Sequence, residues 1–436
     1  TAPTMTISVS PEVDGTTTND GTLAVTFESS EVTTNFASED VTVTNGSIGS
    51  TFAAGGNGTT YTATFTPDAD GATTIKVASS KFTDAVGNAN TESNTIAWTF
   101  DSTVPTVTGV IVAGGDGNYK ATEVVTIEIT FSEAVVVTGS APTLALSTGV
   151  NATYDSGTDS DTLTFLYTVA AGENSADLDY AATTSLSGTI KDLYGNDANL
   201  TLAAVGESGS ISENLDVVID TTAPTVSEAV AVTTPSNDTT PSFTINSNEA
   251  GTITSSKTID TGGTASSGDN VVTLVALVAG SYTPTATVTD ASGNETTITL
   301  TTFVIDTTSP AAFQSTTVAS TGGTAVSTYY NSTNTAVSVT TPIASNDATL
   351  VGGTLRIQAK VGANGTFVNR GNEAAITGAG DQVVSISASD VEGLANFDEG
   401  VVLYFRAVIT DSAGNATTGT ASATTLTVDQ AAPSVS

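Results

Sequence analysis

A short sequence recurs four times along this 436-residue chain and divides it into parts. Its copies read FDSTVPTV (100–107), IDTTAPTV (219–226), IDTTSPAA (305–312) and VDQAAPSV (428–435). In each copy an Asp follows an apolar residue, and a Pro stands four positions later. Because proline cannot donate to a sheet ladder, it is tolerated only on an edge or at the first position of a strand. We therefore interpret each copy as a joint between two β-domains.

The spacing of these joints predicts the domain organisation. The joint aspartates lie 119, 86 and 123 residues apart, which is the size of one β-sandwich domain and too long for a solenoid repeat. Both ends of the sequence, TAPT and APSVS, stand in the same phase of the repeat, so we expect an excerpt from a longer array. We predict an all-β chain in which four sandwich domains form an elongated rod. The predicted domains are 1–101, 102–220, 221–306 (the shortest) and 307–429 (the arginine-containing variant), and 430–436 begins a further repeat.

Composition favours folded domains and removes several kinds of chemistry. A hydrophobic content of 38% argues against disorder, although the net charge is −36. The chain has no cysteine, so neither a disulfide nor a thiolate nucleophile is available. It has no histidine either, which removes the commonest general base and the commonest transition-metal ligand. No helical periodicity is evident.

The charge balance indicates what the chain binds. With 45 Asp and Glu against nine Lys and Arg, it would repel a nucleic-acid backbone or an anionic membrane surface. No stretch has the apolar length of a membrane span, so we predict neither nucleic-acid binding nor membrane insertion. Cations are the expected partners.

Alternating apolar residues predict the strands. In domain 1 they occur in TLAVTF (22–27) and YTATFTPDADG (61–71), and in domain 2 in VVTIEITF (124–131) and DTLTFLYTV (161–169). The strand at 41–44 runs into Asn-Gly, which predicts a hairpin turn. We expect Trp98, the single tryptophan, to be a core or joint-packing residue rather than a platform for sugar stacking.

The fourth domain contains four of the nine cationic residues: Arg356, Lys360, Arg370 and Arg406. One interpretation is a lateral docking face for an acidic neighbour. The other is that these side chains and the neighbouring tyrosines only cover an exposed sheet face by cross-strand pairing. The sequence favours the covering interpretation.

Two acidic positions recur in every domain. A D-x-x-G-N turn follows a core strand at 84–88, 192–196, 290–294 and 411–415, and its Gly can adopt a positive φ. Nearer the start of each domain, we expect a strand to end at a second acidic residue. These residues are Glu31 or Glu28, Glu133, Glu249 and Asp347.

In a sandwich of the immunoglobulin type, the loops with these two acidic residues emerge at the end where the chain enters, and the entering joint adds its own Asp. Three trios of carboxylates are therefore expected to converge: Asp101, Glu133 and Asp192; Asp220, Glu249 and Asp290; and Asp306, Asp347 and Asp411. Without a cation such carboxylates would repel one another, and Ca²⁺ accepts oxygen ligands in irregular geometry. We predict calcium at all three joints. The alternative is that each Asp only forms an Asx-turn and each Glu is solvated.

The joints, together with TFSEAV, TFTPDADG and the turns DAVGN, DASGN and DSAGN, resemble the bacterial immunoglobulin-like repeats of giant, calcium-stiffened surface adhesins, which are commonly exported by type I secretion. The resemblance implies calcium ligands at the joint Asp and at the Asp of D-x-x-G-N. Two departures occur in this sequence. The last joint reads DQAAP, and the fourth domain has Asp347 in place of Glu, so the Asp306 site fits the pattern least well.

These observations favour a non-catalytic spacer of an extracellular, surface-attached adhesin, with calcium ions and neighbouring repeats as partners. Lateral or head-to-tail copies of the chain are further candidate partners. A subunit of a surface layer or an extracellular filament is the alternative. An enzyme is disfavoured because the carboxylates recur at domain ends and because no nucleophile elbow, P-loop, zinc motif or dinucleotide fingerprint is present.

Overall fold

The computed structural model describes residues 1–432 and divides into two compact units, Thr1–Thr222 and the part from Ala223 onward. Within residues 1–432 the buried side chains form four hydrophobic cores, two in each unit, at 5–98, 110–219, 232–305 and 318–428. The all-β prediction is confirmed: the two α-helices of this part, Ile211–Asn214 and Ala388–Glu392, have four and five residues. Neither is long enough to cross a membrane.

The predicted joints at Asp101, Asp220 and Asp306 fall between the four cores. The boundaries themselves stay predictions, and we use them to number domains 1 to 4. The last joint, 428–435, and the predicted further repeat, 430–436, extend beyond the described residues.

Domain 1 consists of two facing sheets. One has the order β1-β3-β7-β5, with β6 on β7, and the other the order β2-β9-β8-β4. Their bounds are β1 Met5–Ser10, β2 Thr17–Thr18, β3 Leu23–Ser29, β4 Val41–Thr44, β5 Gly46–Ile48, β6 Ala53–Ala54, β7 Thr60–Pro67, β8 Gly71–Val77 and β9 Ile96–Phe100, with a 3-10 turn at Ser38–Asp40.

The hairpin predicted at Asn45-Gly46 is wrong. β4 pairs with β8 and β5 pairs with β7, so the chain crosses from one sheet to the other at Asn45. Asn45 adopts a φ of 53°, and its amide donates to Ala69 O at 2.6 Å. Asn tolerates this left-handed conformation better than most residues, so here it redirects a strand between sheets.

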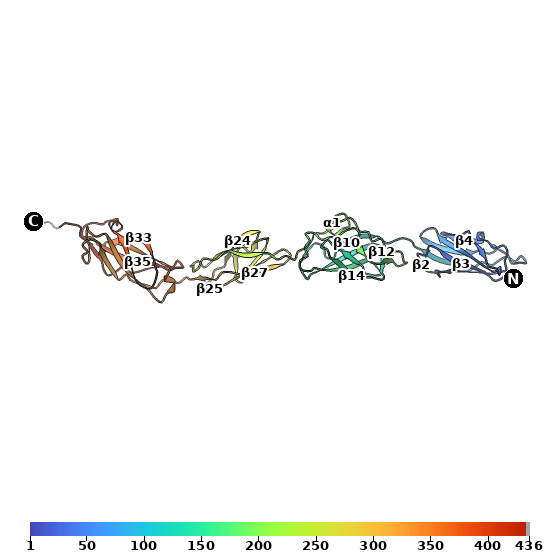
Figure 1. Ribbon diagram of the computed structural model, residues 1–436, viewed down its shortest axis with the longest axis horizontal. Helices are drawn as coiled ribbons and strands as arrows, with labels where there is room; N and C mark the ends of the chain where they lie inside the picture. Colours follow the sequence, from blue (N-terminus) through green and yellow to red (C-terminus); the bar gives the residue numbers. More distant parts are fainter. Residues whose placement is uncertain (433–436) are drawn as a thin grey trace. The chain divides into compact units, whose positions relative to one another are not determined.

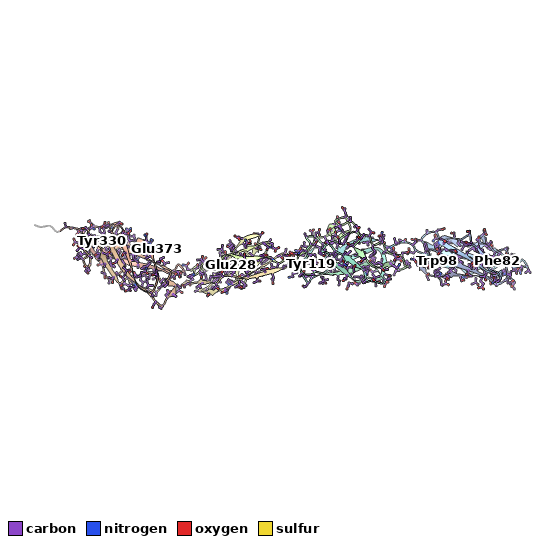
Figure 2. The ribbon with its side chains drawn as sticks, in the orientation of Figure 1. Phe82, Trp98, Tyr119, Glu228, Tyr330 and Glu373 are labelled. Atoms are coloured by element: carbon purple, nitrogen blue, oxygen red, sulfur yellow. The ribbon has the colours of Figure 1, made fainter. Side chains whose placement is uncertain are left out.

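Trp98 is 4% exposed and meets Phe65 edge-on, with ring centroids 5.2 Å apart. Trp98 lies on β9, and the buried Phe82 lies in the segment before β9 of the same domain (Figure 2). The expected core role of the tryptophan is therefore confirmed.

Domain 2 is built on a sheet of order β10-β12-β15-β14-β13-β16, with β17 on β12 and a separate parallel pair β11-β18. Figure 1 shows β10, β12 and β14 together in this domain. The bounds are β10 Val107–Val112, β11 Gly117–Tyr119, β12 Val124–Val137, β13 Thr143–Ala145, β14 Asn151–Ser156, β15 Ser160–Thr168, β16 Leu186–Ser187, β17 Ile190–Asp192, α1 Ile211–Asn214 and β18 Val217–Ile219.

The strand expected to end at Glu133 continues through it. β12 pairs with β15 up to Thr130, and its register then shifts. At Val135 it pairs with β15 again, and from Val135 on it also pairs with β17. Val135 lies opposite Asp192 in this second pairing. The irregularity therefore places Glu133 between the joint and the end of β17.

Domain 3 has one sheet of order β19-β20-β24-β22, a second of order β23-β21-β26-β27, and the pair β25-β28. The bounds are β19 Val226–Val230, β20 Ser242–Ser247, β21 Gly251–Ser255, β22 Ile259–Thr261, β23 Thr264–Ala265, β24 Gly268–Leu274, β25 Gly280–Tyr282, β26 Thr285–Thr289, β27 Glu295–Thr299 and β28 Phe303–Ile305.

Domain 4 has a three-stranded sheet of order β29-β31-β34 and a larger sheet of order β30-β37-β35-β32-β33. In the larger sheet, β36 also pairs with β35. The bounds are β29 Thr317–Thr321, β30 Tyr329–Tyr330, β31 Ala336–Ile343, β32 Thr354–Val361, β33 Val368–Ala375, β34 Gly380–Ser387, α2 Ala388–Glu392, β35 Val402–Thr410, β36 Ala416–Thr418 and β37 Leu426–Val428, with a 3-10 turn at Ala348–Leu350.

Cationic side chains of domain 4 contact aromatic and polar residues of the same domain. The Arg406 guanidinium lies 4.2 Å from the centroid of the Phe367 ring, and its Nε donates to Gln358 at 2.7 Å. The Lys360 ammonium lies over the rings of Phe367 and Tyr404. These contacts are those that a covering role requires, and the docking interpretation stays a prediction.

Candidate metal site at the first joint

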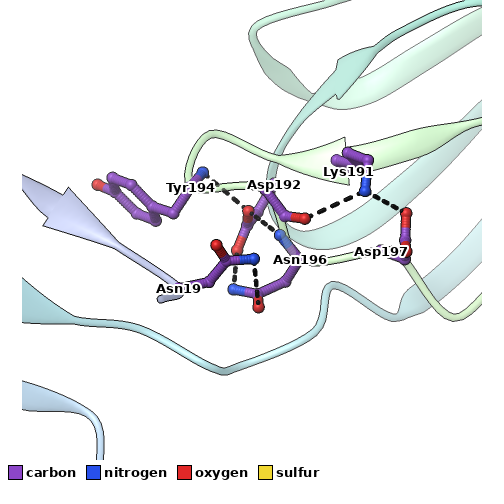
Figure 3. A network of polar contacts seen from close by, with 7 residues as sticks. Asn19, Lys191, Asp192, Tyr194, Asn196 and Asp197 are labelled. Carbon is purple, nitrogen blue, oxygen red and sulfur yellow. Dashed lines mark hydrogen bonds and ion pairs between the residues drawn. The ribbon is translucent and has the colours of Figure 1, made fainter. Parts of the chain in front are cut away.

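The D-x-x-G-N turn of domain 2 is organised by the carboxylate of Asp192. One oxygen accepts the backbone N–H groups of Tyr194 and Asn196, both at 2.8 Å, and the other accepts the Asn196 side-chain amide at 2.6 Å (Figure 3). Gly195 allows the turn because its φ is 105°. The carboxylate is fixed in orientation at the end of β17, and it is only 3% exposed.

The same turn is present in the other three domains. In each, one oxygen of the Asp accepts two backbone N–H groups and the other oxygen accepts the amide of the Asn four residues later. The aspartates are Asp84, Asp290 and Asp411. The motif therefore predicts the local geometry correctly in every domain.

Asp101 is positioned by the end of domain 1. Its N–H donates to Thr18 O at 3.1 Å, where β2 runs parallel to β9. Its side chain accepts the N–H of Thr103 at 3.0 Å, and its carbonyl accepts the Asn196 amide at 3.0 Å. The Asn196 side chain thus joins the joint to the turn that holds Asp192.

The structure brings together the first predicted trio, Asp101, Glu133 and Asp192. Each residue offers a carboxylate oxygen, and these oxygens lie within 4.8 Å of one another. Burial raises the pKa of Glu133 above its ordinary value of 4.5, and the charges of Asp101, Asp192 and Asp70 raise it further. When all three carboxylates are ionised and no cation balances their charge, their mutual repulsion therefore destabilises the folded state.

The donor set fits a hard divalent cation. Its ligand atoms are carboxylate oxygens from three separate segments, which suits the irregular oxygen coordination of Ca²⁺. The nearby Lys191 ammonium does not neutralise the trio, because it lies 2.5 Å from Asp197. Within residues 1–432 the other ion pair is Arg356–Glu373, in domain 4.

A fourth carboxylate, Asp70, was missed by the sequence analysis. It comes from the turn between β7 and β8 of domain 1 and accepts the N–H of Ser102 at 2.6 Å and its hydroxyl at 2.7 Å. It also accepts the hydroxyl of Thr103, and these hydrogen bonds lower the pKa of Asp70. Its only sequence signal was the acidic turn TFTPDADG. Through these hydrogen bonds, Asp70 fixes the two residues that follow Asp101.

The second trio is divided between the two compact units. Asp220 lies in the first unit, where its side chain accepts the N–H of Thr222 at 2.9 Å. Glu249 and Asp290 lie in the second unit, after β20 and β26 respectively. A shared site of these three residues stays a prediction.

The third trio does not form a cluster like the first. Among the described residues, Asp306, Asp347 and Asp411 do not appear together in any group of carboxylates within 4.8 Å. Asp306 and Asp347 line one cleft of about 500 Å³, but Asp347 caps the following 3-10 turn by accepting the N–H and hydroxyl of Thr349. Asp347 lies after β31 rather than at the position of Glu133, so the departure noted in the sequence coincides with a different local structure.

Residues 1–99 match the family model of the bacterial Ig-like domain. Over these residues the chain is therefore similar to bacterial Ig-like domains. Such domains are typically non-enzymatic structural modules of extracellular and surface proteins. No curated protein matches the chain.

Several solved structures match the chain at low sequence identity. Domains from titin share 10% identity, with 74% of this chain and 99% of that chain covered and a TM-score of 0.29. Dimeric latent PorU from Porphyromonas gingivalis shares 12% identity, with 77% and 35% covered and a TM-score of 0.17. A Salmonella alpha-2-macroglobulin mutant shares 11%, with 98% and 34% covered and a TM-score of 0.17. The chain spans about a third of each of the last two.

Proposed function

We propose that this chain is a spacer segment of a bacterial cell-surface adhesin and that Ca²⁺ bound at its interdomain joints stiffens it. The observation that carries the proposal is the convergence of Asp101, Glu133 and Asp192 to within 4.8 Å at the first joint. The bacterial Ig-like domain at residues 1–99 supports an extracellular structural role.

Calcium would stiffen the joint because its ligands come from both sides of it. Asp101 is bonded to β2 of domain 1, whereas Glu133 and Asp192 belong to domain 2. An ion that all three bind removes freedom of rotation between the domains. The high negative charge acts in the same direction, because self-repulsion opposes collapse and self-association.

The strength required of such a site is modest. Extracellular calcium modules bind with dissociation constants of about 10⁻⁴ to 10⁻³ M. Because the ion binds the native state, it stabilises the fold by roughly 2.7 kcal/mol at a hundredfold excess over the dissociation constant. Mg²⁺ should substitute poorly, since it requires a tighter octahedral shell.

Calorimetric titration with CaCl₂, and with MgCl₂ in parallel, tests the proposal on the purified chain. We expect calcium to bind and to raise the melting temperature, and Asp101→Ala to remove one binding event. Asp155→Ala is the matched control, because Asp155 is an exposed carboxylate on β14 of domain 2, outside the trio. Equal titrations for the wild type and Asp101→Ala would contradict a site at this joint.

A further inference from the structure

An asparagine that precedes a glycine can lose its side-chain amide without an enzyme. The backbone nitrogen of the glycine attacks the asparagine Cγ, a five-membered succinimide ring closes, and ammonia leaves. Water then opens the ring and produces either an aspartate or an isoaspartate. Glycine favours the attack because it has no Cβ and rotates freely, but both residues must first be released from contacts that hold them in another geometry.

Three asparagine–glycine pairs occur in the chain: Asn45-Gly46, Asn57-Gly58 and Asn364-Gly365. Each pair lies between two consecutive strands, in the segments that connect β4 to β5, β6 to β7 and β32 to β33 respectively. The dipeptide alone does not distinguish them. The contacts of each asparagine therefore decide which pair reacts in the folded chain.

The first pair is held by packing and by hydrogen bonds. Asn45 is half-buried, and its side-chain amide donates to Ala69 O at 2.6 Å and to Thr73 Oγ1 at 3.2 Å. Gly46 lies against a buried ring, because a Cβ built on it would be 2.2 Å from Phe65. Ring closure at this pair requires these contacts to break.

The second pair has an exposed asparagine whose side chain is bonded within its own turn. Asn57 Oδ1 accepts the N–H groups of Thr59 at 3.1 Å and Thr60 at 3.2 Å, and Nδ2 donates to the Thr60 hydroxyl at 3.2 Å. The N–H of Gly58, which would have to attack, donates to Gly55 O at 3.2 Å. This turn must therefore open before the ring can close.

The third pair has no such restraint on its asparagine. Asn364 and Gly365 are both exposed, and within residues 1–432 the Asn364 side chain makes no hydrogen bond. The Gly365 N–H donates to Gly362 O at 3.2 Å, which is the long end of the usual range. Ring closure therefore has to break this backbone bond, but no bond of the asparagine side chain.

We propose that Asn364 is a site of spontaneous deamidation and that it converts faster than Asn45 and Asn57 in the folded chain. The bond that forms joins Gly365 N to Asn364 Cγ, and the bond that breaks releases Nδ2 as ammonia. Water supplies the oxygen of the new carboxylate. No oxidant, metal or partner takes part, so the modification goes beyond the spacer function and does not depend on it.

Deamidation changes the charge near Lys360. The Lys360 ammonium contacts the carbonyl of Ala363, the residue before Asn364, and lies 4.9 Å from the centroid of the Phe367 ring. Among the described residues, this ammonium forms no ion pair with a carboxylate. The product therefore carries a carboxylate on the loop that this cation contacts, and the positive charge of this part of domain 4 decreases.

Peptide mapping by mass spectrometry tests the proposal on the intact chain. The folded protein is incubated in mildly alkaline buffer made with water enriched in heavy oxygen, so that only carboxylates formed during the incubation carry the label. We expect Asn364 to convert at least about tenfold faster than Asn45 or Asn57, because at least two ordinary hydrogen bonds must open at each of the other two sites.

Two comparisons complete the test. Asn364→Gln should remove the labelled product at this position, because its longer side chain closes a larger ring far more slowly, whereas the matched control Asn57→Gln should leave the Asn364 product unchanged. In denaturant the three pairs should convert at similar rates, since the contacts that distinguish them are lost. Conversion of Asn45 or Asn57 in the folded chain as fast as Asn364 would overturn the proposal. A ranking that persists in denaturant would also overturn it, because the selectivity would then come from the neighbouring sequence and not from the fold.

Discussion

At the first joint, Glu133 is the carboxylate most affected by its surroundings. Burial and the charges of Asp101, Asp192 and Asp70 raise its pKa above 4.5. A raised pKa in the folded state contributes stability that is present at low pH and is lost as the pH rises through the folded-state value. In chelator, the melting temperature should therefore fall as the pH rises from about 4.5, and calcium should oppose this fall.

Replacing the carboxylate tests that assignment. Glu133→Gln in chelator should lose the pH-dependent decrease attributed to this residue, because the amide does not ionise. Glu123→Gln, another acidic position of domain 2 outside the trio, should retain it. The measurement is a series of thermal melts between pH 4 and 7, about the range in which a raised carboxyl titrates. If the melting temperature of Glu133→Gln varied with pH as that of the wild type does, Glu133 would not be the titrating group.

Asn196 links two members of the trio, Asp101 and Asp192. Its amide bonds both the Asp192 carboxylate and the Asp101 carbonyl. Groups that orient metal ligands typically contribute 10- to 100-fold to metal affinity, so Asn196→Ala should weaken calcium binding by about that factor. Asn151→Ala, at an exposed position on β14, is the matched control. Unchanged affinity by calorimetry would mean that the amide has no orienting role.

The sequence predicted that Asp101, Glu133 and Asp192 converge, because each residue lies at a recognisable strand or turn signal. It did not reach Asp70, since that residue acts by clamping Ser102 and Thr103, which lie more than 30 residues away along the chain. It was also unable to show that Asp347 caps a 3-10 turn, because an acidic residue after a strand has the same signal in both situations.

At the scale of strands, period-2 patterns predicted β3, β7, β12 and β15 well, but not their pairings. The Asn-Gly at 45–46 indicated a hairpin, whereas the strands on either side of it belong to different sheets. Likewise, β12 continues beyond Phe131 because, after a register shift, it gains β17 as a further partner. Both outcomes depend on which strand is adjacent in space, and no local pattern encodes that.

The cationic residues of domain 4 allow a test of the lateral docking hypothesis. Replacing Arg356, Arg370 and Arg406 with Gln should weaken side-by-side association at low salt if this face docks on an acidic neighbour. Surface substitutions usually change stability by no more than about 0.5 kcal/mol each, so the melt should change little. Sedimentation at low and high salt would measure the association. Equal association of the two proteins would exclude docking through this face.

At the scale of the whole molecule, two contributions are expected to restrict motion at the joints. The first is direct contact across the joint, through hydrogen bonds such as that from the Asn415 side-chain amide to the Asp306 carbonyl. The second is the calcium ion that we propose at the joint of Asp101, where three carboxylates cluster. The repeated joint motif predicted where the chain divides, because Asp101, Asp220 and Asp306 fall between the four hydrophobic cores.

Small-angle X-ray scattering with calcium and with chelator measures the central claim most directly. If calcium stiffens the joints, chelation should shorten the maximum dimension and increase flexibility, and Asp101→Ala should reproduce part of this change in the presence of calcium. Superimposable scattering profiles in calcium and chelator, together with equal melting temperatures, would contradict the account. The carboxylate trios would then be turn residues only, and the joints would be held by packing and hydrogen bonds alone.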